Sequence, residues 1–410
     1  MTLHVLLVNR WFPPHSGFGG VAMYNYYLSR ALVRLGHRVT VISSRWSPDA
    51  QACEHIDGVK VIRLLLRHRA WLHRLPGIGR YMRGLVETDY SIRAAQAIRA
   101  VHRRDPADVV EFAEIGAEGF SYLKSARRLP VVVRCHTPTA VLVQHYLPAE
   151  IPYSTHWTQA KEKYCVHAAE GLTAPSLDMA RTAARIFTLE RKAIRVIPNP
   201  IDVNTFCPSE GRVPTPESSG ITILHVGRLE RVKGIQVLAE AMPKIVEQVP
   251  TVRFVFIGED RRDPTDGQSW QEKIGKWAQT AGIPCSFPGE VNLTDLVQWY
   301  HRSDIACVPT LNYESFSYTT AQAMAAGLPV IASNIGAIPE TIGDEDAGIV
   351  LPPGDSNVLA EAVITLARDM ERRLRIGSTA QARARRFFDS IVIAQRMVSE
   401  VYQPIMESRR

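Results

Sequence analysis

Short apolar runs alternate with longer amphipathic stretches along most of this 410-residue chain. Buried strands of a parallel sheet are short apolar runs, and amphipathic helices connect them, so the alternation predicts an α/β fold. A connecting helix is expected over Val21–Leu35, where apolar residues recur at helical spacing before Gly36. The expected strands are Leu3–Val8, Arg38–Ile42, Val59–Leu65, Asp108–Phe112, Pro130–Cys135, Gly171–Ala174, Ile194–Ile197, Ile221–Val226, Val252–Ile257, Asp304–Val308 and Pro329–Ala332.

One segment interrupts this pattern and divides the chain in two. Residues 207–220 read CPSEGRVPTPESSG, and three prolines among serine, glycine and glutamate are typical of a linker. The length of the chain also favours two domains. We expect domains at 1–206 and 221–389, followed by a C-terminal helix within 390–410. Helices after the linker are expected at Lys233–Val249, Leu293–Arg302, Ser315–Ala326, Ser356–Asp369 and Ser390–Met406.

The cysteines and the N-terminus bear on the compartment. Six scattered cysteines form no C-x-x-C pair, which argues against a zinc site and against a disulfide framework. We therefore expect no metal site and a cytoplasmic protein. Residues 1–8 carry no basic leader and are interpreted as a first buried strand, not as a signal peptide. No apolar stretch approaches the roughly 20 residues that span a bilayer.

Basic residues are concentrated in the first half of the chain. The formal net charge is +7, and residues 60–104 carry 11 Lys and Arg side chains against only Glu87 and Asp89. Within them, residues 63–74 read RLLLRHRAWLHR, a pattern that suits an anionic acceptor or peripheral contact with the inner face of a membrane. The alternative is a solvated face of a strand and helix whose arginines pair locally. No nucleic-acid-binding motif accompanies the charge, so nucleic acid is not an expected partner.

Two short segments carry the candidate chemistry. Residues 227–234, GRLERVKG, place Arg228 and Lys233 in the turn between an expected strand and a helix. Residues 314–322, ESFSYTTAQ, place Glu314 just before another helix. Two cations and a helix N-terminus can bind a diphosphate, and a carboxylate beside them can accept hydrogen bonds from sugar hydroxyls. Ordinary surface cations and a dipole-stabilised carboxylate are the alternative for each residue taken alone.

With these two segments the chain resembles a family 4 retaining glycosyltransferase of the GT-B architecture. The resemblance implies two Rossmann-like domains with parallel sheets facing a central cleft, and a last helix that crosses back to the first domain. It implies hexose transfer, with retention, from a UDP- or GDP-sugar to a hydroxyl of a glycan, lipid-linked or small-molecule acceptor, without metal or cofactor.

Other activities remain as alternatives to this interpretation. They are a GT-B phosphorylase or synthase with related chemistry, and a nucleotide-sugar-binding protein that has lost transfer activity. A nicotinamide oxidoreductase is disfavoured because the dinucleotide fingerprint is missing.

The resemblance also assigns roles to individual residues. Arg228 and Lys233 would neutralise the departing diphosphate, while Glu314 and His136 would hold the donor sugar. Family members often have glutamate at the position of Gln322, so a weaker ribose contact is expected from the neutral amide. The other expected donor-binding residues are Gly19, Gly20, Gly227, Ser317, Tyr318 and Thr319. Acceptor hydroxyls are assigned to Glu111 and Glu114, for which local ion pairing is the alternative.

Overall fold

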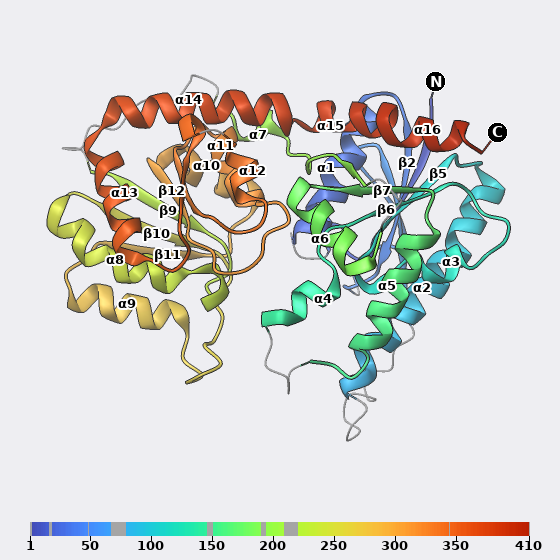
Figure 1. The fold of residues 1–410 in the computed structure, drawn as a ribbon, viewed down its shortest axis with the longest axis horizontal. Coiled ribbons are helices and arrows are strands. Elements are labelled where there is room, and N and C mark those ends of the chain that lie inside the picture. The colour runs from blue at the N-terminus through green and yellow to red at the C-terminus, as the bar shows by residue number, and fades with distance from the viewer. Residues whose placement is uncertain are drawn as a thin grey trace. The chain divides into compact units, whose positions relative to one another are not determined.

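The computed structural model describes residues 2–15, 19–47, 49–66, 79–145, 151–189, 194–208, 220–343 and 345–409. The chain forms two compact units (Figure 1). The first contains Met1–Pro200 together with Ser390–Arg410, and the second contains Ile201–Asp389. Most of the expected linker, residues 209–219, lies outside the described residues.

The first unit is built on an eight-stranded sheet with the order β3-β4-β2-β1-β5-β6-β7-β8. Strands β1, β5 and β6 are buried along their whole length, as expected for the centre of a parallel sheet. Only β3 is antiparallel to its neighbour, through a turn at Asp57 and Gly58 that have positive φ. The strands are β1 His4–Val8, β2 Arg38–Ser44, β3 Cys53–Ile56, β4 Val59–Leu64, β5 Val109–Ala113, β6 Val131–Arg134, β7 Gly171–Ala174 and β8 Arg195–Val196.

Helices connect these strands in the order that a parallel sheet requires. Helix α1 follows the first strand, and its last turn ends where the backbone N–H of Gly36 donates to the carbonyl of Val33 at 2.9 Å. The helices are α1 Gly20–Arg34, α2 Gly79–Arg104, α3 Phe120–Leu123, α4 Thr139–Leu142, α5 Thr155–Ala168 and α6 Leu177–Phe187.

The C-terminal segment belongs to the first unit, which confirms the expected crossing back. Met397 and Tyr402 join the apolar core formed with α1 and the first strands. The segment is not one continuous helix: α15 (Ser390–Met397) is followed by a π-helical turn, Val398–Tyr402, and by α16 (Gln403–Glu407). Pro404 explains the interruption, because it has no backbone N–H to donate to the preceding turn.

The second unit is built on a six-stranded, fully parallel sheet with the order β11-β10-β9-β12-β13-β14. Its strands are β9 Thr222–Val226, β10 Arg253–Ile257, β11 Cys285–Gly289, β12 Ile305–Val308, β13 Val330–Ser333 and β14 Ile349–Leu351. Its helices are α7 Val203–Phe206, α8 Ile235–Gln248, α9 Trp270–Thr280, α10 Leu293–Arg302, α11 Tyr318–Ala325, α12 Ile338–Ile342, α13 Ser356–Arg368 and α14 Met370–Phe387. Apolar residues of α8 and α13 form one core with the central strands.

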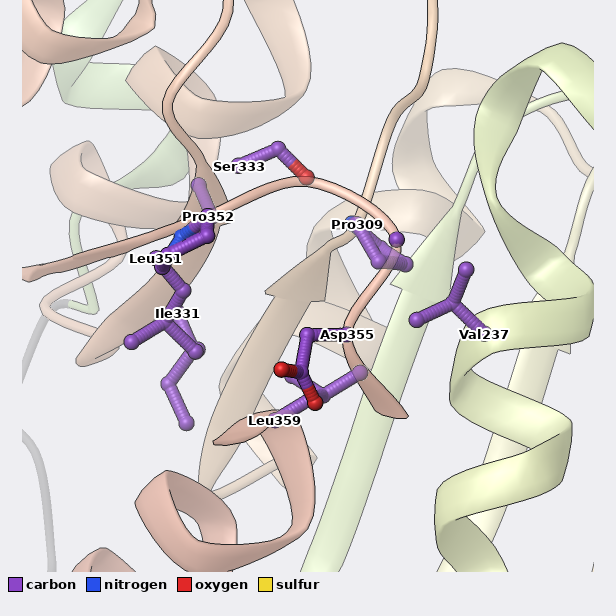
Figure 2. Close-up of a pocket in the computed structure, with 10 residues that line it drawn as sticks. Val237, Pro309, Ile331, Ser333, Leu351, Pro352, Asp355 and Leu359 are labelled. Atoms are coloured by element: carbon purple, nitrogen blue, oxygen red, sulfur yellow. The ribbon is translucent and has the colours of Figure 1, made fainter. Parts of the chain in front are cut away.

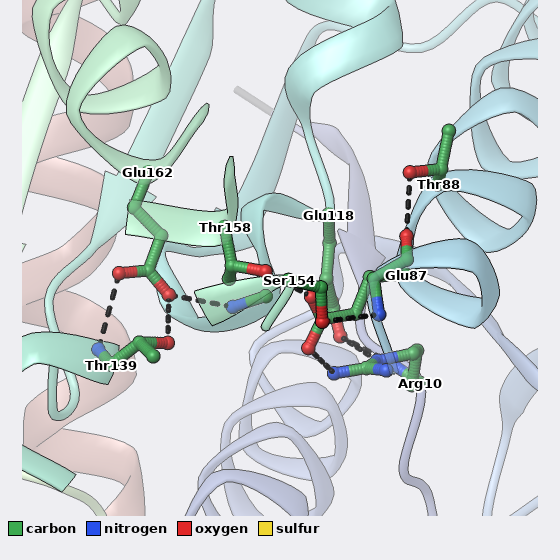
Figure 3. A network of polar contacts seen from close by, with 10 residues as sticks. Arg10, Glu87, Thr88, Glu118, Thr139, Ser154, Thr158 and Glu162 are labelled. Atoms are coloured by element: carbon green, nitrogen blue, oxygen red, sulfur yellow. Dashed lines mark hydrogen bonds and ion pairs between the residues drawn. The ribbon is translucent and has the colours of Figure 1, made fainter. Parts of the chain in front are cut away.

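Carboxylates are unusually deeply buried in the first unit (Figure 3). Arg10 Nε lies 3.2 Å from Glu118 Oε1, and Thr158 donates to Glu87 at 2.6 Å. Glu162 accepts hydrogen bonds from the hydroxyl of Thr139 and from the backbone of Gly116. Burial raises the pKa of Glu118 and of Glu162 to about 7. It raises the pKa of Glu114 to about 8, so these carboxyls hold protons near neutral pH.

Thermal stability should therefore fall as pH rises from about 6.5 to 8. The folded pKa of Glu114 lies above its unfolded value of 4.5, so its contribution is fully present below 4.5 and is lost as pH rises through about 8. The buried histidines His136 and His225 have lowered pKa values, so their contribution to stability rises with pH up to and slightly above the unfolded value of 6.5. They therefore oppose the fall at the lower edge of this window and have no effect at its upper end. We expect Glu114→Gln to flatten the dependence of Tm on pH.

A suitable control is Glu400→Gln. Its ion pair with Arg396 lowers the pKa of Glu400, so this carboxylate is ionised throughout the same window and the slope should not change. A Tm that stays level or rises between these pH values in the unmodified protein would contradict the expectation.

Candidate active site

The turn after β9 is shaped by two glycines. Gly227 and Gly234 have φ of +155° and +71°. An ideal Cβ on Gly234 would lie 1.7 Å from the carbonyl oxygen of Pro309, so only glycine allows the turn to approach the end of β12 this closely. The backbone N–H of Leu311 completes the contact by donating to the carbonyl of Val232 at 2.9 Å. This close approach explains why the helix begins at Ile235 and not at Lys233.

The same approach brings Lys233 to Glu314, 81 positions later in the chain. Lys233 Nζ lies 2.5 Å from Glu314 Oε1, and the two side chains are 25% and 19% exposed. Gly336 lies against the backbone of Glu314, since a Cβ on Gly336 would lie 2.3 Å from the carbonyl oxygen of Glu314. That carbonyl accepts a hydrogen bond from the backbone of Ala337 at 2.8 Å. The cation and carboxylate predicted from the two segments therefore form one site.

Arg228 lies on the same turn and remains open to solvent. Its side chain is 51% exposed, and its guanidinium lies 2.8 Å from Glu230 Oε1. A solvent-exposed ion pair is worth about 0–1 kcal/mol, so Arg228 can exchange Glu230 for an anionic ligand at little cost. The predicted residues Arg228, Lys233 and Glu314 thus place two cations and one carboxylate around a single strand–helix turn.

The N-terminus of α11 faces the end of β9. Ser317 is buried at the N-cap, and its Oγ accepts from the backbone N–H of Thr320. Thr319 ties this turn to β9 because its hydroxyl donates to the carbonyl of Val226 at 3.4 Å. Tyr318 is the first residue of the helix. The positive end of the helix dipole therefore lies beside the turn that carries the cations, an arrangement that favours anions.

Gln322 is largely buried in the second turn of α11. Its Oε1 accepts a hydrogen bond from the hydroxyl of Tyr300 at 3.3 Å. One lone pair of the carbonyl is thus engaged within the protein, while its second lone pair can accept from a ligand and the amide NH₂ can donate to one. The sequence did not indicate Tyr300, which lies inside the apolar pattern of α10.

His225 is a second buried group that the sequence analysis missed. Its Nδ1 lies 3.2 Å from the carbonyl oxygen of Cys307, so this nitrogen carries the proton. Burial lowers its pKa to about 4, and nearby Lys233 adds to the effect. The ring lies beside Gly227, and its Nε2 has no hydrogen-bond partner among the described residues. The available signal was a polar ring two positions before a glycine in an otherwise apolar strand.

The predicted site residues of the first unit that concern the donor lie at the start of α1 and directly after β6. Gly19 is the N-cap of α1, and Gly20 is its first residue. A Cβ on Gly19 would meet no atom within 4 Å, so packing within the described part of the unit does not require glycine there. His136 is 4% exposed, and its ring edge packs on Tyr24 with centroids 5.1 Å apart. Burial and the charge of Arg134 lower the pKa of His136 well below its usual value, so the imidazole is neutral.

The two carboxylates expected at the acceptor have different surroundings. Glu111 accepts hydrogen bonds from the hydroxyls of Tyr24 and Tyr402, both at 2.6 Å. Both of its oxygens are thus engaged, and we assign Glu111 to fastening the C-terminal segment to the first unit. Glu114 Oε2 accepts from the backbone N–H of His136 at 2.7 Å, which links this carboxyl to the position predicted to hold the sugar.

A small pocket lies at the ends of β12, β13 and β14 in the second unit (Figure 2). Val237, Pro309, Ser333, Leu351 and Asp355 are among its lining residues, and its volume is about 10 Å³. A cavity of this volume has room for about one water molecule. It therefore does not take a nucleotide, and the predicted donor residues do not line it.

The described part of the chain contains neither a cluster of metal ligands nor a membrane-spanning helix. No group of three or more His, Cys, Asp and Glu side chains converges there as metal ligands would. No helix in those ranges combines the length and apolar character needed to cross a bilayer.

Comparison with known families identifies the class of protein. The model for Glycosyltransferase Family 4 matches residues 18–205, and the model for Glycosyl transferases group 1 matches residues 220–369. The chain belongs to glycosyltransferase family 4 and has the GT-B fold, as the sequence motifs predicted. It is accordingly an enzyme with hexosyltransferase activity.

Individual relatives agree with this assignment. The chain is 26% identical over 384 residues to a D-inositol 3-phosphate glycosyltransferase of Xylanimonas cellulosilytica, which covers 90% of this chain and 88% of that protein. A sucrose-phosphate synthase from Thermosynechococcus elongatus has the same fold, with a TM-score of 0.78 and 22% identity over 99% of this chain and 100% of that one. Anabaena HepE in complex with UDP-glucose has a TM-score of 0.67 and 18% identity over 98% and 100% of the two chains.

Proposed function

We propose that this enzyme transfers a hexose, with retention of configuration, from a UDP- or GDP-sugar to a hydroxyl of a glycan, lipid-linked or small-molecule acceptor. The observation that carries the proposal is the contact between Lys233 and Glu314 on the turn that also bears Arg228. These three side chains offer two cations for a diphosphate and one carboxylate for sugar hydroxyls. The fold shared with a UDP-glucose complex is consistent with such a donor.

The chemistry follows from where charge develops. As the bond between the sugar C1 and the diphosphate oxygen breaks, negative charge grows on the leaving group, and Arg228 and Lys233 stabilise it together with the N-terminus of α11. The acceptor oxygen forms the new bond to C1 on the same face. Its proton passes to an oxygen of the departing diphosphate. In this scheme the cations and the helix perform the charge neutralisation, and no metal is required.

The remaining residues position the substrates in this proposal. Glu314 accepts hydrogen bonds from the donor sugar, and its contact with Lys233 holds the carboxylate in place. The neutral imidazole of His136 binds a sugar hydroxyl, the turn at Gly19 and Gly20 approaches the phosphates, and Glu114 serves the acceptor. Gln322 meets the ribose through its side-chain amide, whose oxygen is held in place by Tyr300. The backbone N–H groups of Ser317, Tyr318 and Thr319, together with Gly227, complete the donor site.

Ligand-dependent thermal stability tests the donor site directly. The protein is heated with UDP, GDP and ADP and with their glucose, mannose and N-acetylglucosamine conjugates, with and without EDTA. A ligand at about 100 times its Kd stabilises the folded state by about 2.7 kcal/mol, which raises the midpoint measurably. We expect one nucleotide to give a selective shift that EDTA does not change.

The matched variants are Arg228→Ala and Arg261→Ala. Arg261 has the same kind of setting, since it is 49% exposed and lies 2.6 Å from Glu259, two residues away. The shift should disappear in Arg228→Ala and persist in Arg261→Ala. If no nucleotide shifts the midpoint of the unmodified protein, the donor site proposed here is wrong.

A further inference from the structure

An aromatic and basic face lies on the first unit, where α5, α3 and α2 pack against one another. Tyr164 packs edge-on against Phe120, with ring centroids 5.3 Å apart. The ammonium of Lys124 lies 4.5 Å from the centroid of Phe120 and 6.0 Å from that of Tyr164. Lys161 connects α5 to α2, since its Nζ donates to Thr88 Oγ1 at 2.7 Å and lies 5.6 Å from the Phe120 centroid. These contacts make one continuous surface across three helices.

Large apolar side chains border this surface and are open to solvent. Trp157, one helical turn before Lys161, is 55% exposed. Leu85 and Ile92, three residues before and four residues after Thr88, are 49% and 46% exposed. This spacing places them on the same sides of their helices as Lys161 and Thr88. We call the set the α2–α5 face; its members are Leu85, Ile92, Phe120, Lys124, Trp157, Lys161 and Tyr164.

The charge of the face is positive. The nearby carboxylates Glu87, Glu118 and Glu162 are buried, and Asp89 is paired with Arg93 at 2.8 Å. Lys124 and Lys161 are therefore not offset by exposed carboxylates of these segments. A soluble protein rarely exposes apolar side chains in a contiguous group unless the group binds something.

The composition of the face identifies the chemistry of its partner. Tryptophan and tyrosine beside lysines are typical of surfaces that lie at the boundary between lipid headgroups and acyl chains. A carbohydrate would stack on the aromatic rings but would gain little from the aliphatic side chains of Leu85 and Ile92. The lysines match the negative charge of anionic phospholipids. The face therefore fits a bilayer better than a soluble glycan.

We propose that the α2–α5 face docks the enzyme on an anionic phospholipid bilayer. Lys124 and Lys161 would lie at the level of the phosphates, with Trp157, Leu85 and Ile92 at the edge of the acyl region. Leu85 and Ile92 lie within the basic region 60–104 for which the sequence suggested membrane contact, whereas the other members of the face lie after that region in the chain. Residues 67–78 of the region lie outside the described residues. The face is independent of the donor site and goes beyond the proposed transfer reaction.

Vesicle flotation of the full-length protein tests the proposal. The probes are vesicles of phosphatidylcholine alone and of an equal mixture of phosphatidylcholine and phosphatidylglycerol, each at low and high salt. The unmodified protein should bind the mixed vesicles at low salt and bind less at high salt. The double variant Lys124→Gln and Lys161→Gln should bind at least about tenfold more weakly, because the attraction of each lysine to the anionic surface adds to the binding free energy. Trp157→Ser should also weaken binding. This loss should depend less on salt than the loss in the lysine variant, because the tryptophan contributes apolar contact and not charge.

The matched control is the double variant Lys276→Gln and Trp277→Ser on α9, where the tryptophan is 38% exposed. It should bind vesicles as the unmodified protein does. Every variant should also keep its Tm and its nucleotide-induced shift. A loss of membrane binding is thereby distinguished from a failure of the proposed donor site. The proposal is overturned if the unmodified protein does not float with mixed vesicles, or if the face variants bind as well as the control. It is also overturned if neutralising Arg67, Arg69 and Arg74 alone removes all binding, or if the face binds a soluble glycan and no lipid.

Discussion

Replacing Lys233 by methionine should lower kcat/KM by about 10²–10³-fold, the usual cost of removing one group that stabilises developing negative charge. Methionine keeps most of the length of the side chain but removes the ammonium that lies 2.5 Å from Glu314. The loss should fall mainly on kcat, because the cation acts most strongly when charge appears on the leaving diphosphate. Initial rates with the nucleotide sugar identified by thermal shift provide the measurement.

Two comparisons separate this effect from a loss of folding. Lys244, on the exposed side of α8, lies 3.1 Å from Glu361, and Lys244→Met should leave the rate unchanged. The pair of Lys233 with Glu314 is partly exposed, so its loss should cost no more than about 1 kcal/mol of stability. A tenfold change in kcat/KM corresponds to about 1.4 kcal/mol of activation free energy. A Lys233→Met enzyme whose kcat/KM stays within that limit of the unmodified value would argue against a role for this ammonium in the transition state.

Gly234→Ala should be among the most destabilising single substitutions in the second unit. Its φ of +71° disfavours any side chain by about 1–2 kcal/mol, and the new Cβ would lie 1.7 Å from the carbonyl oxygen of Pro309. The two loops must separate to relieve this overlap, so we expect a total loss of about 3 kcal/mol or more in the free energy of unfolding. Urea denaturation measures it.

Gly267→Ala is the control for the backbone contribution. Gly267 has the same φ of +71°, but a Cβ there meets no atom within 4 Å. It should lose only the contribution from backbone conformation, about 1–2 kcal/mol. Equal losses in the two variants would mean that the loops around Gly234 yield easily and that the close approach does not hold Lys233 against Glu314.

The buried strands of the fold were predictable because their apolar runs are short and uninterrupted. Strand β7 and helix α10 have the predicted bounds. The strands that were missed, β3, β11 and β14, are all partly exposed, so they lack the apolar signal of a central parallel strand. Some helix boundaries differ from the prediction because a capping side chain fixes the end of the helix. Helix α11 was expected to begin at Ser315, but the side chain of Ser317 caps it, so its first residue is Tyr318.

The site was predictable where local sequence fixes the geometry. Arg228, Lys233 and Glu314 follow strands or precede helices, so their positions at one end of the sheet follow from the topology. The partners His225 and Tyr300 were missed because each lies inside an apolar segment, where a polar ring looks like part of the core. Long-range hydrogen bonds of this kind depend on tertiary packing, which a single sequence does not encode locally.

The discontinuity of the first unit has a consequence for biosynthesis. Six residues of the C-terminal segment complete a core whose other buried members lie among the first 200 residues; they are Ile393, Ala394, Met397, Val398, Val401 and Tyr402. A ribosome therefore makes the whole second unit before the first can acquire its last core residues. The second unit can fold while the nascent chain is still attached, whereas the face of α1 that receives the C-terminal segment stays uncovered until residues 393–402 have left the ribosome. Chaperones that bind exposed apolar surface would be expected to hold the first unit during that interval.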